Sequence, residues 1–153
     1  MNELTGAECW SLLGSADVAS IAVVDDGEPY VTPMSFVQRD DVILFRTGPG
    51  RRLDAIRKHP RVNVNLNEVN AETGDWHSVN VWGDAEIVDD DELEAEVISL
   101  FLDKYRQFEG PPASWGAPEL VPGTAVVVRV AIDAISGRSS GSAFGPKTRP
   151  GRL

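Results

Sequence analysis

The feature that most constrains the fold is a series of short apolar runs that alternate with polar residues and are divided by turn residues. In the clearest run, Val62, Val64 and Leu66 alternate with asparagines. Alternation with a period of two is typical of a β-strand with one buried face. Further strands are predicted over residues 18–24, 29–38, 42–47, 76–88 and 124–132. Six strands in one short chain indicate a mainly β domain.

The residues between the runs indicate how consecutive strands connect. Asp25-Asp26-Gly27 and Arg39-Asp40-Asp41 divide the first three strands, and Asp-Gly between strands is a strong hairpin signal. Pro33 cannot donate a hydrogen bond to a neighbouring strand, so its strand is predicted to lie at an edge or to bulge there. Gly83 predicts a kink or bulge inside the strand at 76–88. Hairpin connections favour an antiparallel sheet.

Helices are predicted at three places between the strands. Residues 5–8 form a capping box that starts a helix, and Gly14 is its predicted stop. Residues 53–58 are predicted to form a short helix. A second capping box at residues 89–92 starts a helix whose apolar residues recur at helical spacing as far as about Phe108. Together these elements predict an antiparallel barrel with helices over its openings.

The composition limits the expected partners. The 153 residues suit a single domain with one core. The net charge is −10, from 14 basic and 24 acidic residues, and such a surface repels phosphate backbones, so no nucleic-acid partner is expected. No apolar run approaches the roughly 20 residues that span a bilayer, so no membrane partner is expected. The N-terminal residues lack the features of a secretory signal, and we therefore expect a cytoplasmic protein.

The sequence does not point to a metal or to a protein nucleophile. Cys9 is the only cysteine, so neither an intramolecular disulfide nor a structural zinc site is expected. We interpret Cys9 as an inert, partly buried thiol on the first helix. His59 and His77 lie far apart, and neither has a metal-ligand motif nearby. No metal site is predicted, and no catalytic residue is assigned.

The segment from Thr47 to Arg52 combines three features that favour anion binding. Gly48 and Gly50 let the backbone approach a ligand closely. The start of the following helix offers free N–H groups and the positive end of the helix dipole. Arg51 and Arg52 add charge-assisted, bidentate hydrogen bonds. The segment therefore indicates a phosphate site, and the alternative is a strand-to-helix turn that carries surface arginines.

Several short segments, in order and with fitting gaps, resemble a known family. They are residues 27–36, 43–47, 50–53, 59–62, 76–85 and 135–138. Together they resemble the FMN-binding split-barrel family typified by pyridoxamine-phosphate oxidase, and in particular its small bacterial members. The resemblance implies a six-stranded antiparallel split β-barrel of Greek-key type with flanking helices over residues 1–138. Residues 139–153, rich in Gly, Ser, Pro and Arg, are then a flexible tail.

The resemblance also implies a homodimer with flavin mononucleotide (FMN) at the interface, where both subunits touch it. The implied cofactor-binding residues are Pro33, Met34, Ser35, Phe36, Arg46, Thr47, Arg51, Arg52 and Ser78. Residues 33–36 would run beneath the flavin ring, and residues 46–47 would lie near the ribityl phosphate. Residues 51–52 would hold the phosphate itself, and Ser78 would come from the other subunit.

Three further residues are candidates for a substrate site, and two positions depart from the family. Trp76 and Trp115 border loops, and Arg138 could reach a substrate or the edge of the flavin. The family commonly has lysine where Arg52 stands, and many relatives carry Gly-Arg where this chain has Asp17-Val18. The motifs with which true pyridoxamine-phosphate oxidases grip pyridoxal phosphate are not evident, so that activity is not assigned.

Three functions remain open on the sequence alone. The first is a flavin-dependent oxidoreductase acting on an unidentified small molecule, since the cofactor performs the electron chemistry and the protein need only bind and shield it. The second is the same barrel with the deazaflavin F420, whose acidic tail would suit a basic groove formed by Arg57, Lys58 and Arg61. The third is a flavin-binding or sensing module without catalysis.

Overall fold

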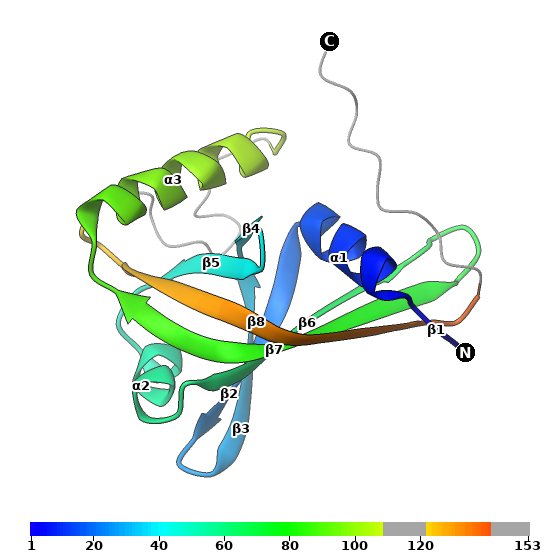
Figure 1. Cartoon of the computed structure of the whole chain (residues 1–153), viewed down its shortest axis with the longest axis horizontal. Helices are drawn as coiled ribbons and strands as arrows, with labels where there is room; N and C mark the ends of the chain where they lie inside the picture. Colours follow the sequence, from blue (N-terminus) through cyan, green and yellow to red (C-terminus); the bar gives the residue numbers. More distant parts are fainter. Residues whose placement is uncertain (109–121, 142–153) are drawn as a thin grey trace.

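A computed structural model describes residues 1–108 and 122–141 and shows one antiparallel sheet with helices packed around it (Figure 1). The helices are α1 (Gly6–Ser15), α2 (Arg51–Lys58) and α3 (Asp91–Tyr105). The strands are β1 (Asn2–Glu3), β2 (Val18–Asp25), β3 (Glu28–Ser35), β4 (Val37–Arg39), β5 (Val42–Thr47), β6 (Arg61–Val69), β7 (Trp76–Val88) and β8 (Val126–Ser139). The predicted fold class, a mainly β antiparallel split barrel with flanking helices, is confirmed.

The sheet curves around a core without closing. Its strands follow the order β3-β2-β6-β7-β8-β5-β4, and β1 pairs with β8. β3 and β4 therefore lie at the two ends, and the split falls between them. The predicted number of six strands is wrong, because the described residues form eight. The strand expected over 29–38 is interrupted at Phe36, and the short β1 adds a further strand.

The two predictions about special strand residues are confirmed. Pro33 lies on β3, which is an edge strand of the described sheet and pairs with β2. At Gly83 the register between β7 and β8 shifts, so that Asp133 is left as an extra residue opposite β7. A Cβ atom at Gly83 would lie 2.1 Å from the carbonyl oxygen of Ala131, so only glycine fits this position.

The first helix begins as predicted and ends later than predicted. The Thr5 hydroxyl accepts a hydrogen bond from the Glu8 N–H at 3.3 Å, and the Glu8 carboxylate accepts from the Thr5 N–H at 2.7 Å. This reciprocal pair is a capping box. The helix continues through Gly14 and ends only where Ala16 turns to extended backbone, so Gly14 is not its stop.

The third helix differs from prediction at both ends. Its N-cap is Asp90 and not Asp89, because the Asp90 carboxylate accepts from the Leu93 N–H at 2.8 Å. The helix ends at Tyr105, short of the predicted Phe108. The Tyr105 hydroxyl accepts from the backbone N–H of Phe36 at 3.0 Å, which fixes this end of the helix against the interruption between β3 and β4.

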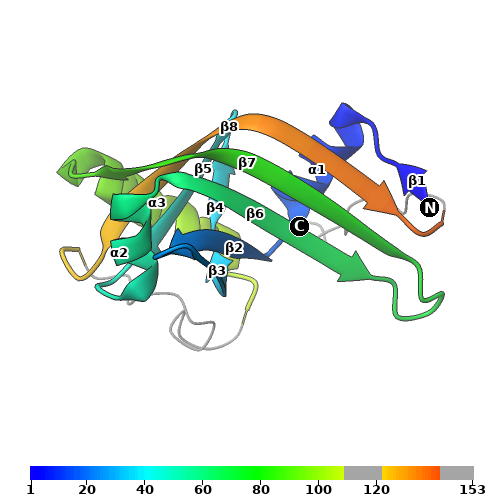
Figure 2. The ribbon, with the colours of Figure 1, turned by 90° about the horizontal axis from the view of Figure 1, so that it is seen from below.

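Three strands continue beyond the barrel as an arm, defined here as residues 66–80 and 134–141 (Figure 2). The last strand, β8, reaches Ser139 rather than the predicted residue 132, because it stays paired with β7 along the arm. Most of the predicted tail at 139–153, from residue 142 onward, lies outside the described residues. Among the described residues, no helix combines the length and the apolar character needed to cross a membrane.

The core lies between the inner face of the sheet and the helices. Its most deeply buried side chains include Leu13, Ile21, Phe36, Ile43, Phe45, Val64, Val79, Val97, Phe101 and Val128. Cys9 is buried in the same cluster, and burial raises the pKa of its thiol. A neutral thiol is a poor nucleophile, which agrees with the interpretation of Cys9 as inert.

Candidate functional site

The segment between β5 and α2 forms a corner, defined here as residues 47–52. The strand β5 ends at Thr47, and α2 begins at Arg51 after the Gly48-Pro49-Gly50 turn. Gly50 is the N-cap and has a φ of 153°, which favours glycine. No side chain caps this helix, so the N–H groups of its first turn point outward without a side-chain acceptor. The helix end therefore offers donors to an anion.

The guanidinium of Arg52 makes several hydrogen bonds at the corner. Its Nη2 donates to the Thr47 hydroxyl at 3.1 Å, and its Nη1 donates to the Thr32 hydroxyl at 3.1 Å. Nη1 also donates to the carbonyl oxygen of Pro33 at 3.3 Å. All of these acceptors are neutral, and within the described residues Arg52 has no carboxylate partner. Partial burial lowers the pKa of this guanidinium, so a bound anion would relieve an uncompensated charge.

Arg52 also lies across the split in the barrel. Thr32 belongs to the edge strand β3, whereas Thr47 belongs to β5, near the other end of the sheet. One side chain from α2 thus holds hydroxyl groups from two strands that do not pair with each other. The corner consequently lies at the opening of the split and not on a continuous sheet surface.

Arg51 has different neighbours from Arg52. Its guanidinium pairs with the Asp25 carboxylate at 2.5 Å and lies 4.2 Å from the centre of the Tyr30 ring. The hydrogen bond that Arg51 donates to the Asp25 carboxylate raises the pKa of Arg51. The positive charge of Arg51 is therefore already balanced, and the structure separates the two arginines that the sequence placed together on a phosphate.

Arg46 points away from the corner. Neighbouring residues of a strand face opposite sides, and the buried Arg46 guanidinium donates to Glu94 of α3 at 2.7 Å. Hydrogen bonds from the Gly123 N–H and from Arg46 lower the pKa of the Glu94 carboxyl. Arg46 therefore joins β5 to α3, and its guanidinium is not brought together with that of Arg52.

The predicted segment 33–36 begins beside the corner and ends beneath α3. The carbonyl of Pro33 contacts Arg52, and Met34 is buried. The Ser35 hydroxyl is buried and has no hydrogen-bond partner within the described part of the chain. The carbonyl of Phe36 accepts from Lys104 at 2.6 Å, so its backbone is already held by α3. Ser35 is thus the one member of the segment whose side chain has a buried polar group without a hydrogen-bond partner in the described residues.

The other predicted residues lie on the arm. A pocket of about 240 Å³ is lined by Trp76, Ser78, Asn80, Ser136, Gly137 and Arg138. Ser78 pairs in register with Arg138, and the Ser78 hydroxyl accepts from Asn65 at 3.0 Å. α2 and the arm lie at opposite ends of the sheet in Figure 1, so one chain does not bring this pocket to its own corner. Trp115 lies outside the described residues.

Thr32 is the site residue that sequence reasoning missed. It lies 20 positions from Arg52 in the chain, and only the folding of β3 beside the split brings the two together. A threonine on an exposed-looking strand gives no signal of this contact. The part of the chain that the structure describes contains no cluster of His, Cys, Asp or Glu side chains positioned to hold a metal ion.

Comparisons with known proteins agree with this architecture. A family model described as pyridoxamine 5′-phosphate oxidase matches residues 5–139. A protein of Rhizobium meliloti strain 1021 is 29% identical over 76 residues, and the match spans 50% of this chain and 50% of that protein.

Two solved structures are similar over nearly the whole chain. An FAD-binding protein of Mesorhizobium loti has a TM-score of 0.73 at 26% identity, covering 92% of this chain and 98% of that one. An FAD-binding protein of Mycobacterium smegmatis has a TM-score of 0.64 at 28% identity, covering 90% and 98% of the two chains.

Proposed function

Because the chain belongs to the pyridoxamine 5′-phosphate oxidase family, we propose that it binds a flavin nucleotide whose phosphate lies in the corner of residues 47–52. One observation carries this proposal. Arg52 holds a partly buried positive charge with only neutral partners, directly beside a helix start that no side chain caps. An anion bound there would balance the charge and accept from the free N–H groups of α2.

A second observation, on the segment 33–36, supports a ligand beside the corner. The unpartnered Ser35 hydroxyl lies two residues beyond Pro33, whose carbonyl contacts Arg52. A buried polar group without a partner is costly, so a ligand that hydrogen-bonds to Ser35 would be favoured. FMN and FAD both carry the ribityl phosphate that the corner requires. Two similar proteins are called FAD-binding, which supports a flavin in general and leaves FMN as one of two candidates.

The alternative cofactor F420 receives less support. Its acidic tail would need a groove of uncompensated cations next to the corner. The three basic residues available for such a groove each pair with an aspartate: Arg57 with Asp54, Lys58 with Asp26 and Arg61 with Asp133. These pairs are exposed and weak, but they reduce the positive potential that a polyanionic tail would meet.

The proposed activity is a flavin-dependent oxidoreduction of a small molecule. A bound flavin supplies the electron transfer, and the chain binds, orients and shields it. Arg52 would hold the phosphate, and the segment 33–36 would support the ring. No side chain is assigned a proton-transfer role, and oxidation of pyridoxamine phosphate is not assigned. A flavin-binding module without turnover is the alternative, and oxidation of a reduced nicotinamide by the purified protein distinguishes the two.

The proposal includes a homodimer in which the arm of one subunit reaches the corner of the other. The arm pocket contains Trp76, Ser78 and Arg138, and within the described residues Arg138 has no ion-pair partner. A two-fold axis would place these groups of the partner beside the flavin, as the resemblance implies. The predicted substrate residues would then complete a site that one chain leaves open.

Replacement of Arg52 tests the phosphate site. A single charge-assisted hydrogen bond contributes about 1.5–3 kcal/mol, so Arg52→Ala is expected to weaken FMN binding about tenfold to a hundredfold in a fluorescence titration. Arg129→Ala is a matched control, since Arg129 is an exposed arginine of β8 that pairs with Glu86. Unchanged affinity in Arg52→Ala, with normal unfolding, would remove the phosphate assignment.

A further inference from the structure

The side-chain hydrogen bonds between β6 and β7 beside the arm pocket run in one direction. The Asn67 amide donates to the side-chain carbonyl of Asn65 at 3.3 Å. The Asn65 amide in turn donates to the Ser78 hydroxyl at 3.0 Å and to the side-chain carbonyl of Asn80 at 3.2 Å. A longer contact, at 3.3 Å, joins it to the backbone carbonyl of Val79. The four polar side chains share one face of the sheet, because they are paired in register. The chain of hydrogen bonds therefore leads from β6 to the pocket on β7.

This direction turns donors, rather than acceptors, toward the pocket. The Ser78 oxygen already accepts from Asn65, and no described residue accepts from the Ser78 O–H group. The side-chain carbonyl of Asn80 is occupied in the same way, while its NH₂ group donates to none of the residues that the structure describes. Hydrogen bonds in a chain polarise one another, which strengthens the donors at its end. A ligand in the pocket thus meets O–H and N–H groups that require an acceptor.

Arg138 adds a positive charge to these donors. It pairs in register with Ser78, and Ser136 pairs with Asn80, so that the four side chains stand on one face of the sheet. Opposite side chains of paired strands have Cβ atoms about 4.5–5.5 Å apart, so one small group can reach Arg138 and Ser78 together. Arg138 is exposed, and in the described ranges 1–108 and 122–141 no carboxylate pairs with it. Even Glu3, its neighbour in register on β1, forms no ion pair with it.

The size and the wall of the pocket limit the ligand further. Its volume of about 240 Å³ lies below the roughly 300–1,000 Å³ of pockets that enclose a drug-sized ligand, so it suits a small ring system. Trp76 lines the pocket, and aromatic side chains stack on planar rings. A small planar molecule with an anionic, acceptor-rich group matches all of these features.

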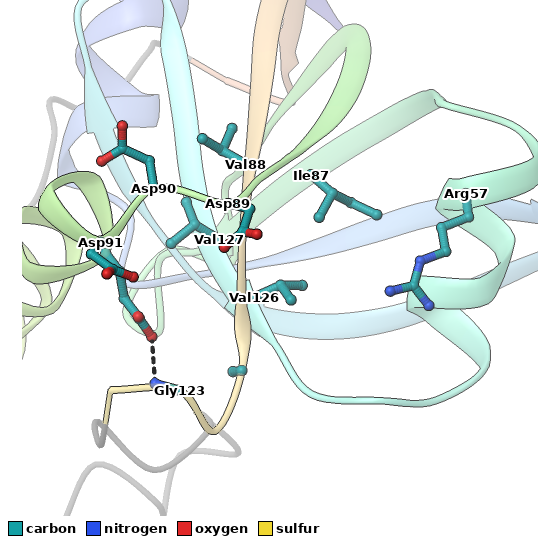
Figure 3. A pocket seen from close by; sticks show the side chains of 11 residues that line it. Arg57, Ile87, Val88, Asp89, Asp90, Asp91, Gly123, Val126 and Val127 are labelled. Carbon is teal, nitrogen blue, oxygen red and sulfur yellow. Dashed lines mark hydrogen bonds between the residues drawn. The ribbon is translucent and has the colours of Figure 1, made fainter.

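A larger cavity near α2 has the opposite charge. It has a volume of about 370 Å³ and lies between α2, the start of β8 and the segment that joins β7 to α3 (Figure 3). Its lining includes Asp89, Asp90, Asp91 and Glu94, and Figure 3 shows Arg57 apart from these carboxylates. Like charges repel, so an organic anion is disfavoured there. Of the two hollows, the arm pocket is therefore the one that suits an anion.

On the basis of the proposed function, we propose that the arm pocket binds the substrate, and that this substrate is a planar organic acid. Its carboxylate accepts from Arg138, Ser78 and Asn80. Its ring lies against Trp76. Asn65 is a positioning residue, because its hydrogen bonds set the direction of the two neutral donors. The oxidised flavin ring carries no net charge, so the cofactor leaves the charge of Arg138 to be balanced by the substrate.

Calorimetric titrations of the full chain with naphthoate and with its neutral counterpart naphthamide test this inference. The wild-type protein is expected to bind naphthoate about tenfold more tightly than naphthamide, since only the acid balances the charge of Arg138. Arg138→Gln keeps a side-chain donor and removes the charge, so it is expected to abolish this preference. Arg129→Gln is the matched control, because Arg129 is an exposed arginine of the same strand that pairs with Glu86 and lies outside the pocket.

A second variant tests the direction of the hydrogen bonds. Asn65→Asp replaces a donor by an acceptor, so the donors of Ser78 and Asn80 turn toward position 65 and away from the pocket. The pocket then presents acceptors, and the preference is expected to shift toward naphthamide, which can donate. Asn63→Asp adds the same charge on the same strand, outside the pocket, where Asn63 donates to the Val81 carbonyl, and it is expected to shift the preference less. Equal shifts in the two variants would overturn the role of Asn65.

Saturation with FMN separates this inference from the proposed function. The substrate site is supported if naphthoate binds the FMN-loaded chain at least as tightly as the flavin-free chain and Arg138→Gln abolishes the preference. Equal binding of acid and amide by the wild-type protein, or displacement of naphthoate by FMN, overturns the substrate site while flavin binding stands. If FMN does not bind, the proposed function fails, and the organic acid loses its role as the substrate of a flavin.

Discussion

The guanidinium of Arg46 is fully buried and donates to the Glu94 carboxylate at 2.7 Å, so that one ion pair joins β5 to the first turn of α3. Glu94 is the more accessible partner, with 16% of its side chain exposed. The pair is therefore asymmetric, because water can reach the carboxylate but not the guanidinium. Removal of one partner should not have the same effect as removal of the other.

The asymmetry leads to a first testable expectation. Glu94→Gln leaves a charged guanidinium buried, whereas Arg46→Met removes that charge and fills a similar volume. We expect Arg46→Met to lower the free energy of unfolding by about 1–2 kcal/mol and Glu94→Gln to lower it further. Urea denaturation measures both values. Glu92→Gln, two residues away in α3 and exposed, serves as the control, and equal losses in all three variants would contradict the asymmetry.

The same pair sets an expectation for acid stability. The Gly123 N–H and Arg46 lower the pKa of Glu94 below its ordinary value of 4.5. A carboxyl with a lowered folded-state pKa contributes its full stabilisation above the unfolded value and loses it as the pH falls through the folded value. The stability difference between wild type and Glu94→Gln should therefore be complete at about pH 6 to 7, roughly two pH units above that ordinary value. It should shrink below pH 4.5, where protonated Glu94 resembles glutamine. If urea denaturation gives the same stability difference across this pH range, the charge of Glu94 does not cause that difference.

Replacement of Gly83 tests the bulge between β7 and β8. An added Cβ would lie 2.1 Å from the Ala131 carbonyl oxygen and 2.8 Å from a methyl group of Val130. Backbone cannot yield as a flexible side chain can, so Gly83→Ala should destabilise the protein by about 3 kcal/mol or more, the upper range for overpacking. Thermal unfolding measures the loss. Gly6→Ala has open space around it and should leave the melting temperature unchanged or raised, and a similar result at Gly83 would disprove the close contact.

Local signals in the sequence explain why much of the fold could be predicted. β5 and β7 have the predicted bounds because glycines, prolines and aspartates mark their ends. The capping box at Thr5 is likewise a property of four consecutive residues. The predicted strand over 29–38 failed because Phe36 is held by Tyr105 and Lys104, which lie almost 70 positions away. Such a contact leaves no local pattern.

The candidate site shows the same contrast between local sequence signals and contacts that form only on folding. The glycines and arginines of the corner are visible in the sequence as a group. Their partners are not, since Thr32 and Asp25 reach Arg52 and Arg51 only through the folding of β2 and β3 beside α2. Sequence reasoning therefore treated the two arginines as equivalent. The structure distinguishes them by charge balance, because only Arg51 already has a carboxylate partner within the described residues.

The proposed homodimer can be tested on the outer face of the sheet. Val31 is 59% exposed and begins a row of residues that pair across four neighbouring strands. The row runs from Val31 through Ala22 and Asn63 to Trp82 on β7. Side chains two residues apart on a strand point the same way, so along β7 the face with Trp82 is also the face that carries the arm pocket.

A charge on this face should prevent association without disturbing the core. Val31→Glu is expected to shift sedimentation from dimer to monomer at micromolar concentration and to weaken flavin binding at the same time, because the partner's arm would no longer reach the corner. Leu102→Glu is the matched control, since Leu102 is 51% exposed on α3. A monomeric wild-type protein, or a Val31→Glu variant that stays dimeric with unchanged flavin affinity, would rule out an interface on this face.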